Sequence, residues 1–115
     1  MSMSPAQRIR NAVAFTGLPC YQNEYTGNDS RYMVFTIGTQ PLLFADDIPW
    51  AERILAQLHL HLPNTENSTS MQSQIKQAIA DADFTYPETE SVGDENGQHI
   101  VFMFECEEGL EHGTV

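Results

Sequence analysis

Two histidines and two aspartates are the residues of this chain whose types and spacing best suit chemistry. His59 and His61 are separated by one residue, so on a β-strand both imidazoles point to the same side, a geometry that can hold a metal ion. A metal site needs a third ligand, and the sequence shows none that converges on them. The favoured interpretation is a row of solvent-facing or interface side chains.

Asp46 and Asp47 are adjacent carboxylates that could serve acid–base catalysis or Mg²⁺ binding. Adjacent side chains usually point apart, and this pair stands directly before Ile48-Pro49. A structural turn or a contact with a partner is therefore favoured over catalysis. Nucleophile motifs such as GxSxG, Walker loops and GxGxxG loops are absent from the sequence. The sequence thus predicts no enzyme, no metal and no cofactor.

The composition is that of one globular domain with a strongly acidic charge. The chain has 115 residues, is 41% hydrophobic and carries a formal net charge of −11. Residues 77–115 contain ten acids and no Lys or Arg. Such a chain repels phosphate backbones and anionic lipid, so we expect neither nucleic-acid binding nor membrane binding.

The cysteines and the N-terminus indicate a protein made in the cytoplasm. Cys20 and Cys106 belong to no CxxC pair or metal spacing, so both are expected to be reduced core residues. The first ten residues lack the apolar region of a signal peptide, and no apolar run is long enough to span a membrane.

The pattern of apolar residues and turn residues predicts a single α+β domain over residues 1–115, with residues 1–4 and 109–115 flexible. Two helices are expected to pack on one face of a mostly antiparallel sheet, in the order α-β-β-β-α-β-β. The expected helices are 4–16 and 71–82. The expected strands are 21–25, 31–38, 53–62, 84–86 and 99–106, with an ordered connection over 39–50 and a hairpin turn over 93–97.

Residues 48–62 allow two interpretations. Asp47 could cap a helix that carries Ile48, Ala51 and Leu55 on one face. Alternation at the end of the segment favours a half-buried strand instead. Its predicted core residues are Ile54, Ala56, Leu58, Leu60 and Leu62, and those of the last strand are Ile100, Phe102, Phe104 and Cys106.

Several apolar residues are candidates for a subunit interface. Both faces of strand 31–38 are apolar, which suits a strand covered on each side. Met33 and Phe35, together with Met103 on the last strand, belong either to the core or to a face that the helices leave uncovered. If uncovered, they would form a patch that monomers avoid. Phe44, beside the Asp46-Asp47 pair, is a further interface candidate.

Five segments together resemble one family of phage proteins. They are the YTGNDSRYMVFTIG region, LLFADDIPWAERILAQLHLHLP, QIKQAIADADFTYP, HIVFMFECE and the N-terminal helix. Over about residues 5–108 the chain is similar to the tail-terminator or tail-completion proteins of siphophages and prophages.

This resemblance implies a structural role in the virion tail, assembled in the host cytoplasm. Copies of the chain, typically six, would form a ring that caps the tail tube, ends its polymerisation and joins the head–tail connector. The matched FADD motif makes Asp46 and Asp47 interface candidates, and Asp94 and Glu95 are candidates for acids that face the ring lumen. The alternatives are a head–tail adaptor, a small ligand-binding regulatory module, and a metal-dependent enzyme that uses His59 and His61.

Overall fold

The computed structural model describes residues 3–45 and 48–109, except for the side chains of residues 43–45, 49 and 50. In chain order, the elements are α1 (Pro5–Val13), the 3₁₀ turn η1 (Ala14–Thr16), β1 (Cys20–Gln22), β2 (Tyr32–Ala45), β3 (Ile48–Leu62), α2 (Thr69–Asp81), β4 (Glu88–Ser91) and β5 (Gln98–Gly109). The five strands form one sheet in the order β1-β2-β3-β5-β4. Among the described strands only β1 and β2 pair in parallel, so the predicted α+β class and element order are confirmed.

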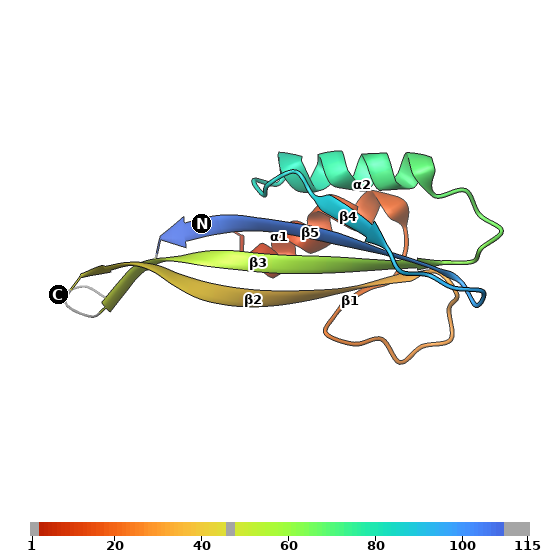
Figure 1. Ribbon diagram of the computed structural model, residues 1–115, viewed down its shortest axis with the longest axis horizontal. Coiled ribbons are helices and arrows are strands. Elements are labelled where there is room, and N and C mark those ends of the chain that lie inside the picture. Colours follow the sequence, from red (N-terminus) through yellow and green to blue (C-terminus); the bar gives the residue numbers. More distant parts are fainter. Residues whose placement is uncertain (1–2, 46–47, 110–115) are drawn as a thin grey trace.

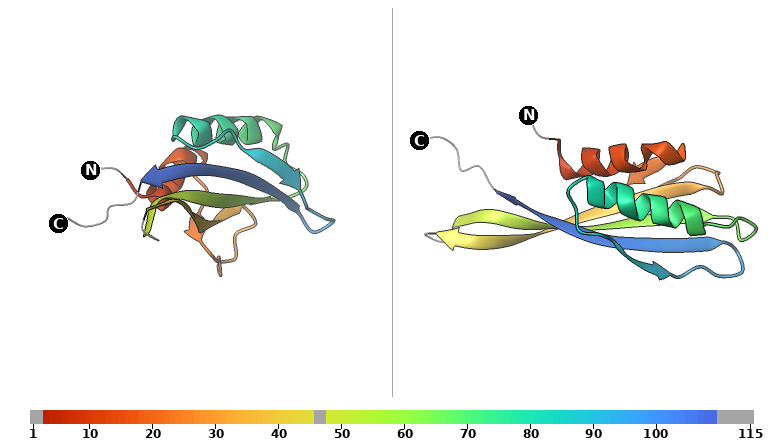
Figure 2. Two further views of the ribbon diagram at one scale, coloured as in Figure 1. Left: turned by 60° about the vertical axis from the view of Figure 1, so that its left-hand side comes forward. Right: turned by 90° about the horizontal axis from the view of Figure 1, so that it is seen from above.

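Both helices cover the same face of the sheet (Figures 1 and 2). They bury Ile9 and Val13 from α1, and Ile75 and Ile79 from α2. The sheet contributes eight of its predicted alternating residues as buried side chains: Ile54, Ala56, Leu58, Leu60 and Leu62 from β3, and Ile100, Phe102 and Phe104 from β5. Cys106, also predicted for the core, is only partly buried. Period-two alternation therefore identified the core face of both strands.

The ends of α1 follow from local chemistry. The Ser4 hydroxyl accepts a hydrogen bond from the Gln7 amide at 3.2 Å, and Pro5 occupies the first turn, where no amide is needed. The 3₁₀ turn after α1 ends at Gly17, whose φ of 71° favours glycine. The predicted flexibility of residues 1–4 stays a prediction, since residues 1 and 2 lie outside the described part of the chain.

The segment over residues 39–50 is mostly strand, not the predicted connection. β2 and β3 keep one antiparallel register from Tyr32 opposite His61 to Ala45 opposite Ile48. β5 ends at Gly109, opposite Ala51. Residues 40–45 and 48–53 therefore form a hairpin arm that extends past the helices and gives the molecule its length of 56 Å (Figure 1). The alternative helix capped by Asp47 is wrong, because its residues pair in β3. Asp47 itself and Asp46 lie outside the described residues.

One further prediction needs correction, and one open alternative is decided. Residues 84–86 form no strand: Thr85 donates one backbone hydrogen bond to Glu105, but Pro87 has no amide to continue the ladder, and β4 begins only at Glu88. Met33 and Phe35 are fully buried beneath the helices, so they belong to the core and do not form an exposed interface.

Arg8 joins α1 to β5. Its Nη2 atom lies 2.9 Å from the Cys106 Sγ and 3.4 Å from a Glu108 carboxylate oxygen, and its guanidinium lies 4.6 Å from the centre of the Phe84 ring. Because the side chain is largely buried, Arg8→Ala loses these polar contacts and the packing of the aliphatic stem at once.

We expect Arg8→Ala to lower the free energy of unfolding by about 1–2 kcal/mol in urea denaturation. Arg10→Ala is the matched control, because Arg10 is exposed on the same helix, and its effect should stay within about 0.5 kcal/mol. Equal losses in the two variants would contradict the role given to Arg8.

Candidate functional site

The sheet face opposite the helices is the candidate site, and we call it the open face. No helix of the described chain covers it (Figure 2). The strand register sets its side chains in rows across β2, β3 and β5: Tyr32, His61 and His99; Val34, His59 and Val101; Thr36, Gln57 and Met103; and Gly38, Leu55 and Glu105. Leu55 is 42% exposed, so apolar surface is presented to solvent near the middle of this face.

One end of the open face carries a row of stacked rings. The ring of Tyr25 stacks on Tyr32 at 4.3 Å between centroids, Tyr32 on His61 at 4.4 Å, and His61 on His99 at 4.2 Å. The Nδ1 atom of His59 lies 2.7 Å from the Nε2 atom of His99. A hydrogen bond at this distance needs one ring to donate and the other to accept, so at least one of the two imidazoles is neutral.

Burial sets the protonation of two of these histidines. It lowers the pKa of His59, and the nearby His99 lowers it further. Burial also lowers the pKa of His61, to about 4, with additional contributions from His99 and His59. These rings are therefore neutral at pH 7 and act there as flat, weakly polar stacking surfaces.

The stacked geometry does not favour a metal site. His99, absent from the sequence-based candidate pair, is the nearest neighbour of both histidines, but the near-parallel His61 and His99 rings do not direct their nitrogens at one point. No group of three His, Cys, Asp or Glu side chains in the described chain is arranged to hold a metal ion. In the sequence, His99 was marked only by its place in the alternation of the last strand. Its contact with His59 and His61 depends on the β3–β5 register.

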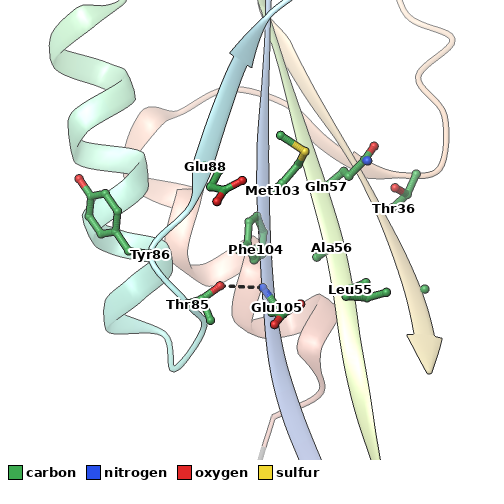
Figure 3. Close-up of a pocket in the computed structure, with 11 residues that line it drawn as sticks. Thr36, Leu55, Ala56, Gln57, Thr85, Tyr86, Glu88, Met103, Phe104 and Glu105 are labelled. Carbon is green, nitrogen blue, oxygen red and sulfur yellow. Dashed lines mark hydrogen bonds between the residues drawn. The ribbon is translucent and has the colours of Figure 1, made fainter. Parts of the chain in front are cut away.

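A groove of about 760 Å³ occupies the other end of the open face (Figure 3). Leu55 and Met103 supply apolar surface, and Glu88 and Glu105 place carboxylates beside it. Arg53 lies 3.9 Å from Glu105 and so balances part of this charge. Gly38 leaves the β2 side of the groove open, since an added Cβ there would meet only the Leu55 carbonyl oxygen at 4.0 Å.

The other sequence candidates are distributed over the molecule. Met103 lies on the open face, whereas Phe44 pairs through its backbone with Pro49 in the hairpin arm. Asp94 and Glu95 are exposed in the turn between β4 and β5, at the end of the molecule remote from the arm (Figure 1). The structure therefore does not bring the interface candidates and the acidic candidates into one site.

Cys20 and Cys106 are free thiols that are only partly buried. Burial raises the pKa of each thiol, and Arg10 near Cys20 and Arg8 near Cys106 oppose that shift. Both thiols are therefore weak nucleophiles at pH 7.

Comparisons with known proteins inform the fold alone. No protein-family model matches the chain, and no curated protein matches it. Among the solved structures that match, one covers 98% of this chain and 100% of its own, with a TM-score of 0.55 and 12% sequence identity. The name of that protein describes no activity, so it supports the same α+β arrangement and nothing further. Among the described residues, no helix has the length and apolar character to cross a membrane.

Proposed function

We propose that this chain is a structural protein of a siphophage or prophage tail that caps the tail tube, ends its polymerisation and supports joining to the head. The observation that carries the proposal is the hairpin arm, residues 40–45 and 48–53. Among the residues that the structure describes, only β2 and β3 pair beyond the level of Gly109, and Ile48 near the tip of the arm is 45% exposed. A two-stranded hairpin is marginal in water by itself, so this arm is built for contact with a partner.

The sequence motifs indicate which partner that is. The ADFTYP junction and the HLHLP strand end resemble tail-terminator proteins, in which a ring of typically six copies contacts the tube protein and the head–tail connector. The open face supplies a second uncovered surface for such contacts. One chain that presents both an arm and a bare sheet face is suited to bind several neighbours at once.

The acidic charge agrees with a path for DNA through such a ring. With a net charge of −11 per chain, a lumen lined by acids would repel phosphates and let DNA slide without sticking. Asp94 and Glu95 are exposed and therefore available for this position. In this proposal the protein is assembled in the host cytoplasm and remains in the virion tail.

Removal of the gene from its prophage tests the function. Loss of a terminator is expected to leave overlong tubes without heads in electron micrographs, because nothing stops addition of the tube protein. Complementation with the intact gene is the control and should restore normal tails. Tails of normal length that lack heads would instead identify a head–tail adaptor, and normal virions would reject both functions.

The groove beside Leu55 and Met103 favours a second candidate, a small ligand-binding regulatory module. Its volume of about 760 Å³ suits a small molecule, although it is open to solvent and flanked by carboxylates. A saturable rise in melting temperature with one cationic metabolite, removed by Gly38→Val, would support this function. Gly109→Val is the matched control, since an added Cβ there has no neighbour within 4 Å.

A further inference from the structure

The outer edge of β2 is unpaired along most of its length. β1 covers only Met33, Val34 and Phe35, and no other described strand lies on that side of residues 36–45 (Figure 1). On its other side, β2 pairs continuously with β3. The backbone of the chain therefore presents an open ladder edge about ten residues long.

The hydrogen bonds to the β1 side identify which groups point outward. The Met33 amide donates to the Pro19 carbonyl at 2.7 Å, and the Phe35 carbonyl accepts from the Asn23 amide at 2.9 Å. Backbone groups alternate in direction along a strand, so those of Ile37, Thr39 and Pro41 point to the same edge. Pro41 thus breaks no bond with β3, because the amide that it lacks would face outward.

This edge has only part of the usual protection against pairing, because Pro41 removes one outward amide but no charged residue accompanies it. Natural proteins guard free edges with charges, and β2 has no charged residue between Tyr32 and Ala45. The opposite edge strand, β4, is only four residues long and carries Glu88 and Glu90. The edge of β2 is therefore the one that favours addition of a further strand.

A matching free edge lies on the other side of the sheet. The Glu105 carbonyl accepts from the Thr85 amide at 2.8 Å, and beyond this bond nothing described covers β5. The same alternation directs the backbone of Glu107 and Gly109 outward. Gln40 of β2 pairs with Arg53 of β3, and Arg53 pairs with Glu107 of β5. The free parts of the two edges therefore lie at the same level along the strands.

The two sides of the sheet also differ in charge. The β5 side belongs to residues 77–115, which hold ten acids and no Lys or Arg, and Arg53 of β3 balances part of this charge at Glu105 and Glu107. The β2 side carries Arg10, whose guanidinium lies 5.3 Å from the centre of the Phe35 ring, and no described carboxylate is within ion-pair distance of it. A second copy placed beside the first therefore presents a net acidic edge to an uncharged edge, and the cation on the uncharged side, Arg10, lies at Phe35.

We propose that the outer edge of β2 over residues 39–42 pairs in parallel with residues 106–109 of β5 in a second copy, so that two sheets join head to tail. Each copy uses a different edge toward each neighbour, and such contacts close into a ring when the rotation permits. The biological role of this contact between copies rests on the proposed function. Its test needs only the purified chain.

The experiment uses proline to block one edge at a time. Thr39→Pro removes an outward amide of β2, and Glu107→Pro removes an outward amide of β5, while the internal ladders keep their bonds. In sedimentation velocity, the wild type should associate as its concentration rises. Each variant alone should associate at least about tenfold more weakly. An equimolar mixture should form a complex of two chains, because each variant keeps the edge that the other has lost. Thr39→Ser and Glu107→Gln keep both amides and serve as controls.

A second pair of variants covers the case in which a proline variant is unfolded by circular dichroism. Gln40→Glu places a carboxylate level with Glu107 of the neighbouring copy and should weaken association, and mixing with Glu107→Lys should restore it. A wild type that stays monomeric, a proline mixture without complexes, or dimers of Glu107→Pro alone would each overturn the head-to-tail pairing. If gene removal still gives overlong tubes, the proposed function stands and only this contact falls.

Discussion

Replacing Phe35 by alanine is expected to lower the free energy of unfolding by about 3–5 kcal/mol. Phe35 is fully buried in the cluster formed by the two helices and the sheet. Its removal loses the transfer energy of a benzyl group and leaves a cavity that β3 and α1 cannot fill without distortion. Since a domain of this size is stable by only about 5–15 kcal/mol, a large part of its stability would disappear.

Thr36→Ala is the matched control for this prediction. Thr36 is the next residue of β2, is exposed on the open face and should change the free energy of unfolding by about 0.5 kcal/mol or less. Urea denaturation of both variants measures the difference. If Phe35→Ala left stability intact and reduced association instead, Phe35 would belong to the interface that the sequence allowed.

Phe35 and Thr36 also show where sequence patterns predict the buried face of a strand and where they do not. On β3 apolar and polar residues alternate over residues 56–62, so the buried face could be predicted residue by residue. On β5 residues 100–104 are all apolar, and the polar residues His99 and Glu105 mark the face that is not the core. On β2 both faces are apolar, and alternation alone does not decide which one meets the helices. The pairing of Met33 with Leu60 and of Phe35 with Leu58 decides it, because it places these residues on the face whose β3 partners were already identified as core.

The hairpin arm could not be predicted because its residues usually end strands. Gly38, Pro41 and Pro49 are typical of loops, and the Asp46-Asp47 pair is typical of a turn. Pro41 is tolerated because its nitrogen faces the unpaired edge of β2, a fact that depends on the position of β1. Strand ends here are decided by tertiary neighbours and not by local propensity.

Prediction from the sequence is limited in the same way for the candidate site on the open face. The sequence places His59 and His61 on one side of a strand, which the structure confirms. It contains nothing that brings His99 to them from 38 residues farther along the chain, since that contact depends on the β3–β5 register. The ring stack, and with it the electrostatics of the site, therefore emerges only from the assembled sheet.

Lowering the pH from about 7 toward 4 is expected to destabilise the protein through His61 and His59. In the folded chain the pKa of each is lowered, that of His61 to about 4 from an ordinary value of 6.5. Between these values the unfolded chain binds more protons than the folded chain, so stability is fully present above pH 6.5 and is lost as the pH falls. Protonation also places positive charges beside one another in a stack whose rings are about 4 Å apart.

The variant His61→Phe separates this effect from the titration of the acids. Phenylalanine keeps a ring against Tyr32 but has no proton to gain, while all 16 Asp and Glu residues are retained. We expect the melting temperature of the wild type to fall by about 5 °C more than that of His61→Phe between pH 7 and pH 5. Calorimetry at matched ionic strength measures both curves. Parallel curves would mean that His61 titrates alike in the folded and unfolded chains, and the stacked imidazoles would then have no part in the pH response.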